Sequence, residues 1–302
     1  MTAPGTHRHL TRDVPVSGGA LRVGVWEPSD PVRGEILAVH GVTSSHRVWA
    51  HVVPRLPGVR VVAPDLRGRG RSSAGGPAGM ARHADDLAAV LAETIGRAPL
   101  VVGHSMGGFV SVVLAHRHPD LVDRVLLIDG GLPLQAPEGL SPEQTVGAIL
   151  GPTAARLRMT FADETAYLEF WRDHPAFPPP WTPELDDYFR YDLVDADGGG
   201  MRPATSEAVT IDDTVDLTTG TTLPAALAAL SHPTRLVTVP RGLRDEEPGL
   251  YPPEHLRRLL SEHPVIEHRR VDGFNHYTIV LTPEGADVVA EEIDAQLDRR
   301  GG

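Results

Sequence analysis

The stretch around Ser105 has the residue types of a nucleophilic site. An apolar run leads into the sequence GHSMG at residues 103–107, and the segment that follows has the composition of a helix. Glycines at this spacing are typical of a sharp turn from a strand into a helix, where side chains would collide and the serine hydroxyl is exposed. We therefore expect Ser105 to be a nucleophile on such a turn, a nucleophile elbow.

A serine hydroxyl is a poor nucleophile at neutral pH and needs a neighbouring base. The chain has no cysteine, and its 28 basic residues other than histidine are all arginine, so it has no lysine. Histidine is therefore the candidate base. Among the 15 histidines, His276 in the sequence VDGFNHYTIVL follows the last predicted strand and precedes the final predicted helix. His276 is the predicted partner of Ser105.

A third group, an acid, must hold the imidazole in place. Asp245 lies in the loop after the first predicted strand that follows a long interruption, which gives the chain order Ser, Asp, His. Asp129 ends the strand after the elbow helix and is an alternative, and Glu246 is a third choice. Both loops are expected at the carboxyl edge of the sheet, where sites of this kind assemble.

The elements that position these residues alternate between short apolar runs and helix-like segments. This alternation predicts an α/β fold with a mostly parallel sheet and helices on both faces. A hairpin with Gly18 and Gly19 at its turn precedes the alternating part. The predicted strands buried on both faces are residues 36–41, 59–65, 99–104 and 124–130, and further strands are predicted at residues 233–240 and 266–273.

The alternation stops for about a hundred residues after the fourth buried strand. We interpret residues 131–231 as an inserted, mainly helical lid, and residues 1–130 and 232–302 as the core domain. Within the insertion, the proline-rich residues 174–183 are expected to be irregular, because proline continues neither a helix nor a central strand.

Composition excludes several classes of function. The net charge of −12 and the absence of a basic stripe disfavour nucleic acid as a partner. No apolar run approaches a membrane span, and the first residues lack the apolar core of a secretory signal, so we expect a cytoplasmic protein. No metal-binding cluster or nucleotide fingerprint is apparent, and no cofactor is implied.

Taken together, these motifs resemble those of the α/β-hydrolase superfamily, in particular its lidded members. The resemblance covers nearly the whole chain outside the insertion. It depends on the pair His40 and Gly41, the sequence DLRGRGRS at residues 65–72, the turn at Ser105, and the pair Asn275 and His276. Because the turn carries serine and not aspartate, the resemblance does not extend to the chemistry of epoxide hydrolases or haloalkane dehalogenases.

The resemblance also implies roles for residues around the nucleophile. In lidded relatives the sequence GERD commonly carries the acid, and GLRD here ends on Asp245, which makes Asp245 the preferred acid and Asp129 the alternative. Relatives use two backbone amides to bind the oxyanion of the tetrahedral intermediate. By position these are the amides of Val42 and Met106.

The insertion carries the main indication of substrate. Nine of the 15 aromatic residues lie there, along with 16 acidic residues and five arginines. A lid that closes over an apolar pocket predicts a bulky hydrophobic or aromatic small molecule, and the negative charge disfavours polyanions such as coenzyme A thioesters. The residues expected to contact substrate are His40, Gly41, Phe170, Trp171 and Trp181.

The predicted function is therefore that of a serine hydrolase that cleaves a carboxylic ester or lactone through an acyl-enzyme on Ser105. A carbon-carbon bond hydrolase or a lyase on the same fold is an alternative, and so is a non-catalytic receptor with a hydrolase-like fold. Substrate profiling and covalent trapping of the serine distinguish these readings.

Overall fold

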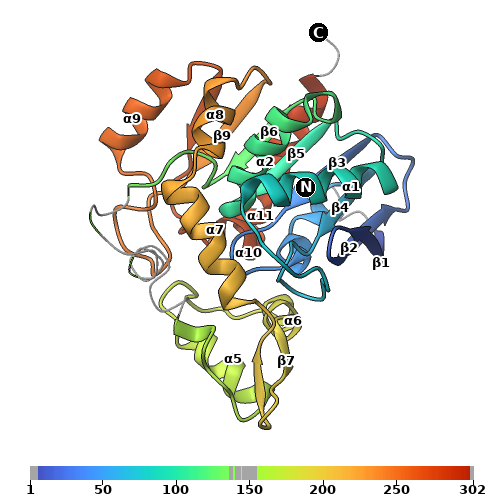
Figure 1. Ribbon diagram of the computed structural model, residues 1–302, viewed down its shortest axis with the longest axis vertical. Coiled ribbons are helices and arrows are strands. Elements are labelled where there is room, and N and C mark those ends of the chain that lie inside the picture. Colours follow the sequence, from blue (N-terminus) through green and yellow to red (C-terminus); the bar gives the residue numbers. More distant parts are fainter. Residues whose placement is uncertain (1–5, 136–138, 140–143, 145–154, 300–302) are drawn as a thin grey trace.

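A single eight-stranded sheet lies at the centre of the molecule (Figure 1). The structure, a computed structural model, describes residues 6–135, 139, 144 and 155–299. The strand order is β1-β2-β4-β3-β5-β6-β9-β10, in which β2 is antiparallel to both β1 and β4 and every other pair is parallel. The strands are β1 (His7–Val16), β2 (Gly19–Pro28), β3 (Gly34–Val39), β4 (Val59–Pro64), β5 (Leu100–His104), β6 (Val125–Ile128), β9 (Thr234–Thr238) and β10 (Ile266–Arg270).

The central strands are apolar on both faces, as expected for a parallel sheet covered by helices. In β3, Ile36 and Ala38 belong to one hydrophobic cluster, whereas Leu37 and Val39 belong to another on the opposite face. This alternation follows from the two-residue period of a strand. The continuous apolar runs in the sequence are thus explained by burial on both faces.

Helices cover both faces of this sheet. Apolar side chains of α1, α2, α8 and α9 pack in one cluster, and those of α10 and α11 pack in the other. No helix in the described part of the chain combines the length and apolar character needed to cross a bilayer. The helices of the core are α1 (Met80–Glu93), α2 (Met106–Arg117), α8 (Thr222–Ala228), α9 (Pro253–Glu262), α10 (Thr278–Leu281) and α11 (Pro283–Asp298).

The predicted fold class is confirmed by this mostly parallel sheet and its two helical layers. The amino-terminal hairpin turns at residues 17 and 18, one residue earlier than predicted, because Gly19 already pairs with Val16 as the first residue of β2. Several parallel strands end earlier than the apolar runs that predicted them. β6 ends at Ile128 and β10 at Arg270, and the residues after them form the loops that carry the candidate site.

The long interruption between β6 and β9 contains two structurally different parts. Its elements α5, α6 and β7 gather at the bottom of Figure 1, away from the sheet, and α7 runs from them towards α2. Helix α8, by contrast, packs on the core through Leu223 and Leu227. The elements before α8 are α5 (Glu164–Arg172), α6 (Pro183–Tyr191), β7 (Leu193–Asp195), β8 (Met201–Pro203) and α7 (Glu207–Thr219).

The lid at residues 131–231 stays a prediction. Part of it, residues 136–138, 140–143 and 145–154, lies outside the described residues. Within these bounds, α8 packs with α2 in one hydrophobic cluster. The proline-rich residues 174–183 form no regular element before α6 begins at Pro183, as predicted.

Helix α7 is attached to the core through its acidic side chains. The Asp213 carboxylate accepts a hydrogen bond from the Gly79 amide at 2.8 Å, and Asp216 accepts one from the Met80 amide at 2.7 Å. These amides lie at the start of α1, where the first amides of a helix have no partner within the helix. Gly79, as the residue that precedes the helix, has no side chain to supply one.

The DLRGRGRS loop at residues 65–72 connects neighbouring parts of the structure through the side chain of Asp65. The Asp65 carboxylate accepts hydrogen bonds from the backbone amide and Nδ1 of His46, from the Arg71 amide and from the Tyr191 hydroxyl, all within 2.9 Å. Asp65 is buried, yet its hydrogen bonds with His46 and its electrostatic interactions with His46 and His40 outweigh that burial and lower its pKa to about 2. The charged carboxylate therefore joins the core loops to α6.

Candidate active site

Ser105 lies on a strained turn between β5 and α2. Its φ of 55° and ψ of −124° are unfavourable for a residue with a side chain. The turn is tight, because a Cβ on Gly103 would lie 2.3 Å from the Gly107 carbonyl oxygen, and one on Gly107 would lie 2.1 Å from the Val39 carbonyl oxygen. The two glycines of the motif are therefore required by the close approach of β5, α2 and β3.

His276 is held by Asp129. The imidazole Nδ1 lies 2.7 Å from the Asp129 Oδ2, and both side chains are almost completely buried. Asp129 follows β6, and its own amide donates to the Val237 carbonyl of β9 at 2.8 Å. A carboxylate only accepts, so Nδ1 donates the proton and Nε2 remains free to act as a base.

The preferred acid, Asp245, does not contact His276, and this expectation is wrong. Its carboxylate accepts a hydrogen bond from the Asn275 side-chain amide at 2.9 Å and pairs with Arg241 at 3.1 Å, and its side chain is 33% exposed. Glu246 accepts from the Arg244 amide and is also away from the histidine. The structure brings Asp129, the alternative acid, to His276.

Val42 and Met106, the predicted oxyanion donors, line the same cavity as Ser105. Nδ1 of the buried His40 donates to the Gly41 carbonyl at 2.7 Å, and its Nε2 accepts from the Leu66 amide at 2.9 Å. Because a trans peptide is planar, anchoring the Gly41 carbonyl directs the Val42 amide to the opposite side. Burial lowers the pKa of His40 to about 4, so the neutral ring that this arrangement needs is maintained.

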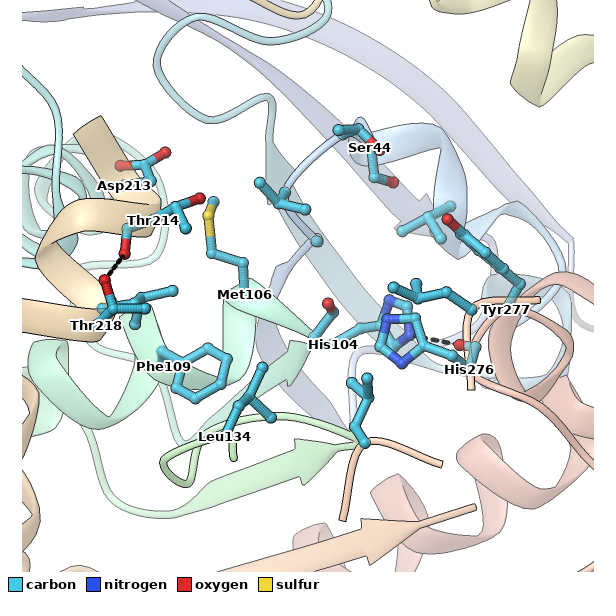
Figure 2. Close-up of a pocket in the computed structure, with 18 of the residues that line it drawn as sticks. Ser44, His104, Met106, Phe109, Leu134, Asp213, Thr214, Thr218, His276 and Tyr277 are labelled. Atoms are coloured by element: carbon cyan, nitrogen blue, oxygen red, sulfur yellow. Dashed lines mark hydrogen bonds between the residues drawn. The ribbon is translucent and has the colours of Figure 1, made fainter. Parts of the chain in front are cut away.

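A second histidine, His104, packs beside His276. The two ring centroids are 4.8 Å apart, and Figure 2 shows the rings next to each other. His104 Nε2 donates to the His276 carbonyl oxygen at 2.9 Å. Burial holds the pKa of His104 well below its usual range, so it fixes the loop of His276 as a neutral group.

Ser105 and His276 open into one cavity of about 270 Å³. Its wall is mostly apolar, with a few polar groups from α7 and from the loop after β3 (Figure 2). This is the general character of a small-molecule site. The lining includes Gly41, Val42, Ser44, His104, Met106, Phe109, Leu134, Trp171, Tyr188, Asp213, Thr214, Leu217, Thr218, Leu223, Leu243, Leu250 and Tyr277.

The residues predicted to contact substrate divide into two groups. Gly41 and Trp171 line the cavity. His40 is fully buried beneath the loop after β3 and acts on Gly41 instead. Phe170 and Trp181 pack within the insertion, where Phe170 contacts Trp171 edge to face and Trp181 stacks on Phe189.

Sequence reasoning missed one wall of the cavity. Asp213, Thr214, Leu217 and Thr218 of α7 line it, and Figure 2 shows Asp213, Thr214 and Thr218 along one side. Leu217 lies four residues after Asp213, and Leu217 and Thr218 lie three and four residues after Thr214, spacings that place residues on one face of a helix. The helical spacing of these residues was the sequence signal for this wall. The face combines polar and apolar residues, so it does not differ from the surface of an ordinary helix.

No group of three or more histidine, aspartate and glutamate side chains among the described residues is arranged to hold a metal ion. The groups of the site that could take part in chemistry are Ser105, His276, Asp129 and the surrounding backbone. Such an arrangement can activate a hydroxyl nucleophile and stabilise an oxyanion.

Known proteins resemble this chain in both sequence and structure. It is 35% identical over 175 residues to lipase LipV from Mycobacterium tuberculosis, which covers 56% of this chain and 61% of the lipase. It is 39% identical over 103 residues to protein ABHD8 from Mus musculus, which covers 32% of this chain and 23% of that protein. The chain thus spans less than two thirds of the length of either relative.

Two solved structures share the fold across nearly the whole chain. The structure of E-2-(acetamidomethylene)succinate hydrolase matches with a TM-score of 0.78 and 24% identity, and covers 96% of this chain and 100% of its own. A thioesterase domain from the curacin biosynthetic pathway matches with a TM-score of 0.72 and 22% identity, and covers 95% and 99% respectively. At these identities the likeness establishes the fold.

The family described as alpha/beta hydrolase fold matches residues 35–186, which is half of the chain. This segment contains nearly all of β3, the turn at Ser105 and Asp129. The chain belongs to the α/β-hydrolase family.

Proposed function

We propose that this protein is a serine hydrolase that cleaves a carboxylic ester or lactone of a bulky, neutral, hydrophobic small molecule. The observation that carries the proposal is the buried bond between His276 Nδ1 and Asp129, next to a cavity that His276 shares with Ser105. Family membership and the similarity to a lipase support a hydrolase. The strained backbone at Ser105 supports a nucleophile.

The proposed reaction has two stages. His276 Nε2 takes the proton of the Ser105 hydroxyl as Oγ attacks the carbonyl carbon, and the amides of Val42 and Met106 stabilise the oxyanion. The carbon-oxygen bond of the ester breaks, and the alcohol leaves with the proton from His276. Water then attacks the acyl-enzyme and gives its proton to His276, and the acid is released as His276 returns that proton to Ser105 Oγ.

Covalent labelling tests the proposal. We expect a fluorophosphonate probe to add once to the wild-type protein, because an activated serine displaces fluoride from phosphorus. Intact-protein mass spectrometry should detect this adduct on wild type and none on Ser105→Ala. Absence of an adduct on the wild-type protein, or an adduct that persists on Ser105→Ala, would contradict the assignment.

The cavity wall supports a neutral, apolar substrate. None of the described residues that line it is an arginine, and its one carboxylate, Asp213, pairs with Arg69 at 2.6 Å. Leu134, Leu217 and Leu223 supply apolar surface. An anionic substrate would find no arginine or lysine along the described part of this wall, whereas an apolar group would gain from burial.

Chain length of the acyl group should therefore control the rate. We expect kcat/KM for p-nitrophenyl octanoate to exceed that for p-nitrophenyl acetate by at least about tenfold. Each buried methylene contributes about 0.8 kcal/mol, so two buried methylenes suffice for this ratio. Steady-state hydrolysis measured by absorbance gives both values.

A matched pair of variants on α7 tests whether the cavity causes this preference. Leu217 lines the cavity, whereas Thr219 is exposed and does not. Leu217→Trp fills the cavity and should lower the ratio of octanoate to acetate, while Thr219→Trp should leave it unchanged. An equal preference in all three proteins, or a preference for acetate in the wild type, would count against the proposed substrate class.

A further inference from the structure

Arg69 of the DLRGRGRS loop is buried and contacts both residues that the proposed function assigns to the oxyanion hole. Its Nε donates to the Val42 carbonyl at 2.9 Å, and one Nη lies 3.8 Å from the Met106 sulfur. The other Nη donates to the Arg67 carbonyl at 2.8 Å. Arg69 is 1% exposed and does not line the cavity, so it contacts Val42 and Met106 from the protein interior and not from the substrate side.

The same guanidinium is joined to helix α7. The Nη that faces Met106 lies 2.6 Å from Asp213 Oδ2. Asp213 in turn accepts from His83 Nε2 at 2.9 Å and from the Gly79 amide at 2.8 Å. In Figure 2 the Met106 side chain, at the start of α2, points towards Asp213 and Thr214 of α7. Helix α7 and the start of α2 therefore approach each other at these residues.

The position of the Val42 backbone depends on such an anchor. Gly41 precedes Val42 and offers little resistance to rotation, because glycine accepts many backbone conformations. His40 fixes the peptide before Val42, and Arg69 fixes the carbonyl after it. Oxyanion donors act only when they are aimed at the position of the developing charge, and small misplacements lower the rate strongly.

We propose that Arg69 is a positioning residue that, held by Asp213, fixes Val42 and Met106 in the orientation needed to bind the oxyanion. This inference rests on the proposed function, since it assigns a role within that mechanism. Through this link the catalytic backbone depends on the seating of α7 on the core.

Lysine substitution separates this role from a structural one. Arg69→Lys keeps a positive charge beside Asp213, but a single ammonium cannot replace the planar fork that reaches Val42, Met106 and Asp213 together. We expect kcat for p-nitrophenyl octanoate to fall by about 10- to 100-fold, with KM within about twofold. KM is spared because Arg69 does not line the cavity.

Arg67 provides a matched control in the same loop. It is equally buried at 1% exposure and pairs with Asp86 through two contacts at 2.9 and 3.0 Å, away from Val42 and Met106. Arg67→Lys should lower the thermal unfolding midpoint and leave kcat within about twofold. If kcat of Arg69→Lys is no lower than that of Arg67→Lys, the proposal is overturned.

A second pair decides the question if either lysine variant does not fold. Asp213→Asn removes the charge that holds Arg69, and Asp86→Asn makes the same change beside Arg67. We expect kcat to fall at least about threefold further in Asp213→Asn than in Asp86→Asn, since only the former releases an anchor of the oxyanion hole. Equal values would overturn the proposal.

Ser105→Ala, measured in parallel, separates the two levels of inference. Activity that survives this substitution contradicts the proposed function, and the role of Arg69 fails with it. If Ser105→Ala abolishes activity but Arg69→Lys and Arg67→Lys have equal kcat, the proposed function stands and only the role of Arg69 is contradicted.

Discussion

Replacing Ser105 with alanine should lower kcat for an ester by about 10⁶-fold and leave the fold intact. A loss of this size is typical when the nucleophile of such a triad is removed, because the covalent step disappears and only the oxyanion hole and substrate binding remain. Steady-state hydrolysis and the thermal unfolding midpoint of the same preparation measure the two quantities. Ser105 is at the surface of the cavity, so the smaller side chain removes little packing.

The double variant sharpens this prediction. His276→Ala alone should cost nearly as much as Ser105→Ala, and the pair together should cost no more than either one, because the two side chains act as a unit. Losses that multiply in the double variant would show that the residues work independently. That result would contradict a serine-histidine mechanism.

Asp129→Asn should lower kcat by about 10⁴-fold, and Asp245→Asn should change it by less than about threefold. An asparagine at position 129 presents an amide in place of a carboxylate, so the ring adopts the wrong tautomer and its protonated form loses its counter-charge. Asp245 contacts Asn275 and Arg241 instead of the histidine.

Asp129→Asn and Asp245→Asn serve as controls for each other. Each substitution removes one carboxylate and keeps the side-chain shape, and the thermal unfolding midpoint reports any loss of folding. A large loss of kcat in Asp245→Asn, with an active Asp129→Asn, would restore the acid that the sequence pattern favoured. Equal losses of kcat in the two variants would mean that neither carboxylate alone serves as the acid of His276.

The sequence was sufficient to predict the fold and to single out Ser105 and His276, which line one cavity, yet it preferred an acid that does not contact His276. The turn at Ser105 and the loop of His276 are local features, with glycines and strand ends that a pattern can contain. Which carboxylate reaches the imidazole depends on how the loops after β6 and β9 bend over the sheet. Asp129 and Asp245 both have positive φ, so backbone strain does not distinguish them.

A local signal for Asp129 nevertheless existed. The residue after it is Gly130, where a Cβ would lie 2.1 Å from the Ser105 carbonyl oxygen. This glycine lets the chain after β6 pass against the elbow, which brings the preceding aspartate to the histidine. The resemblance to GERD at Asp245 outweighed this signal, because a motif match carries no information on distance.

The aromatic residues between β6 and β9 show a different limit of prediction from sequence. A concentration of aromatic residues predicts an apolar surface but does not say which rings face inward. Trp171 lines the cavity, whereas Phe170 and Trp181 pack against other rings of the insertion. Aromatic rings pack well against one another, so a small helical unit uses most of them for its own core.

The attachment of α7 to α1 has a consequence for folding. The amides of Gly79 and Met80 find their partners on Asp213 and Asp216, more than 130 residues later in the chain. Neither end of this contact is satisfied until both are in place, so α1 and α7 are expected to form and melt as one cooperative unit. The segment that contains α7 then contributes to the stability of the core. A shortened chain that lacks α7 would expose the first turn of the core helix α1.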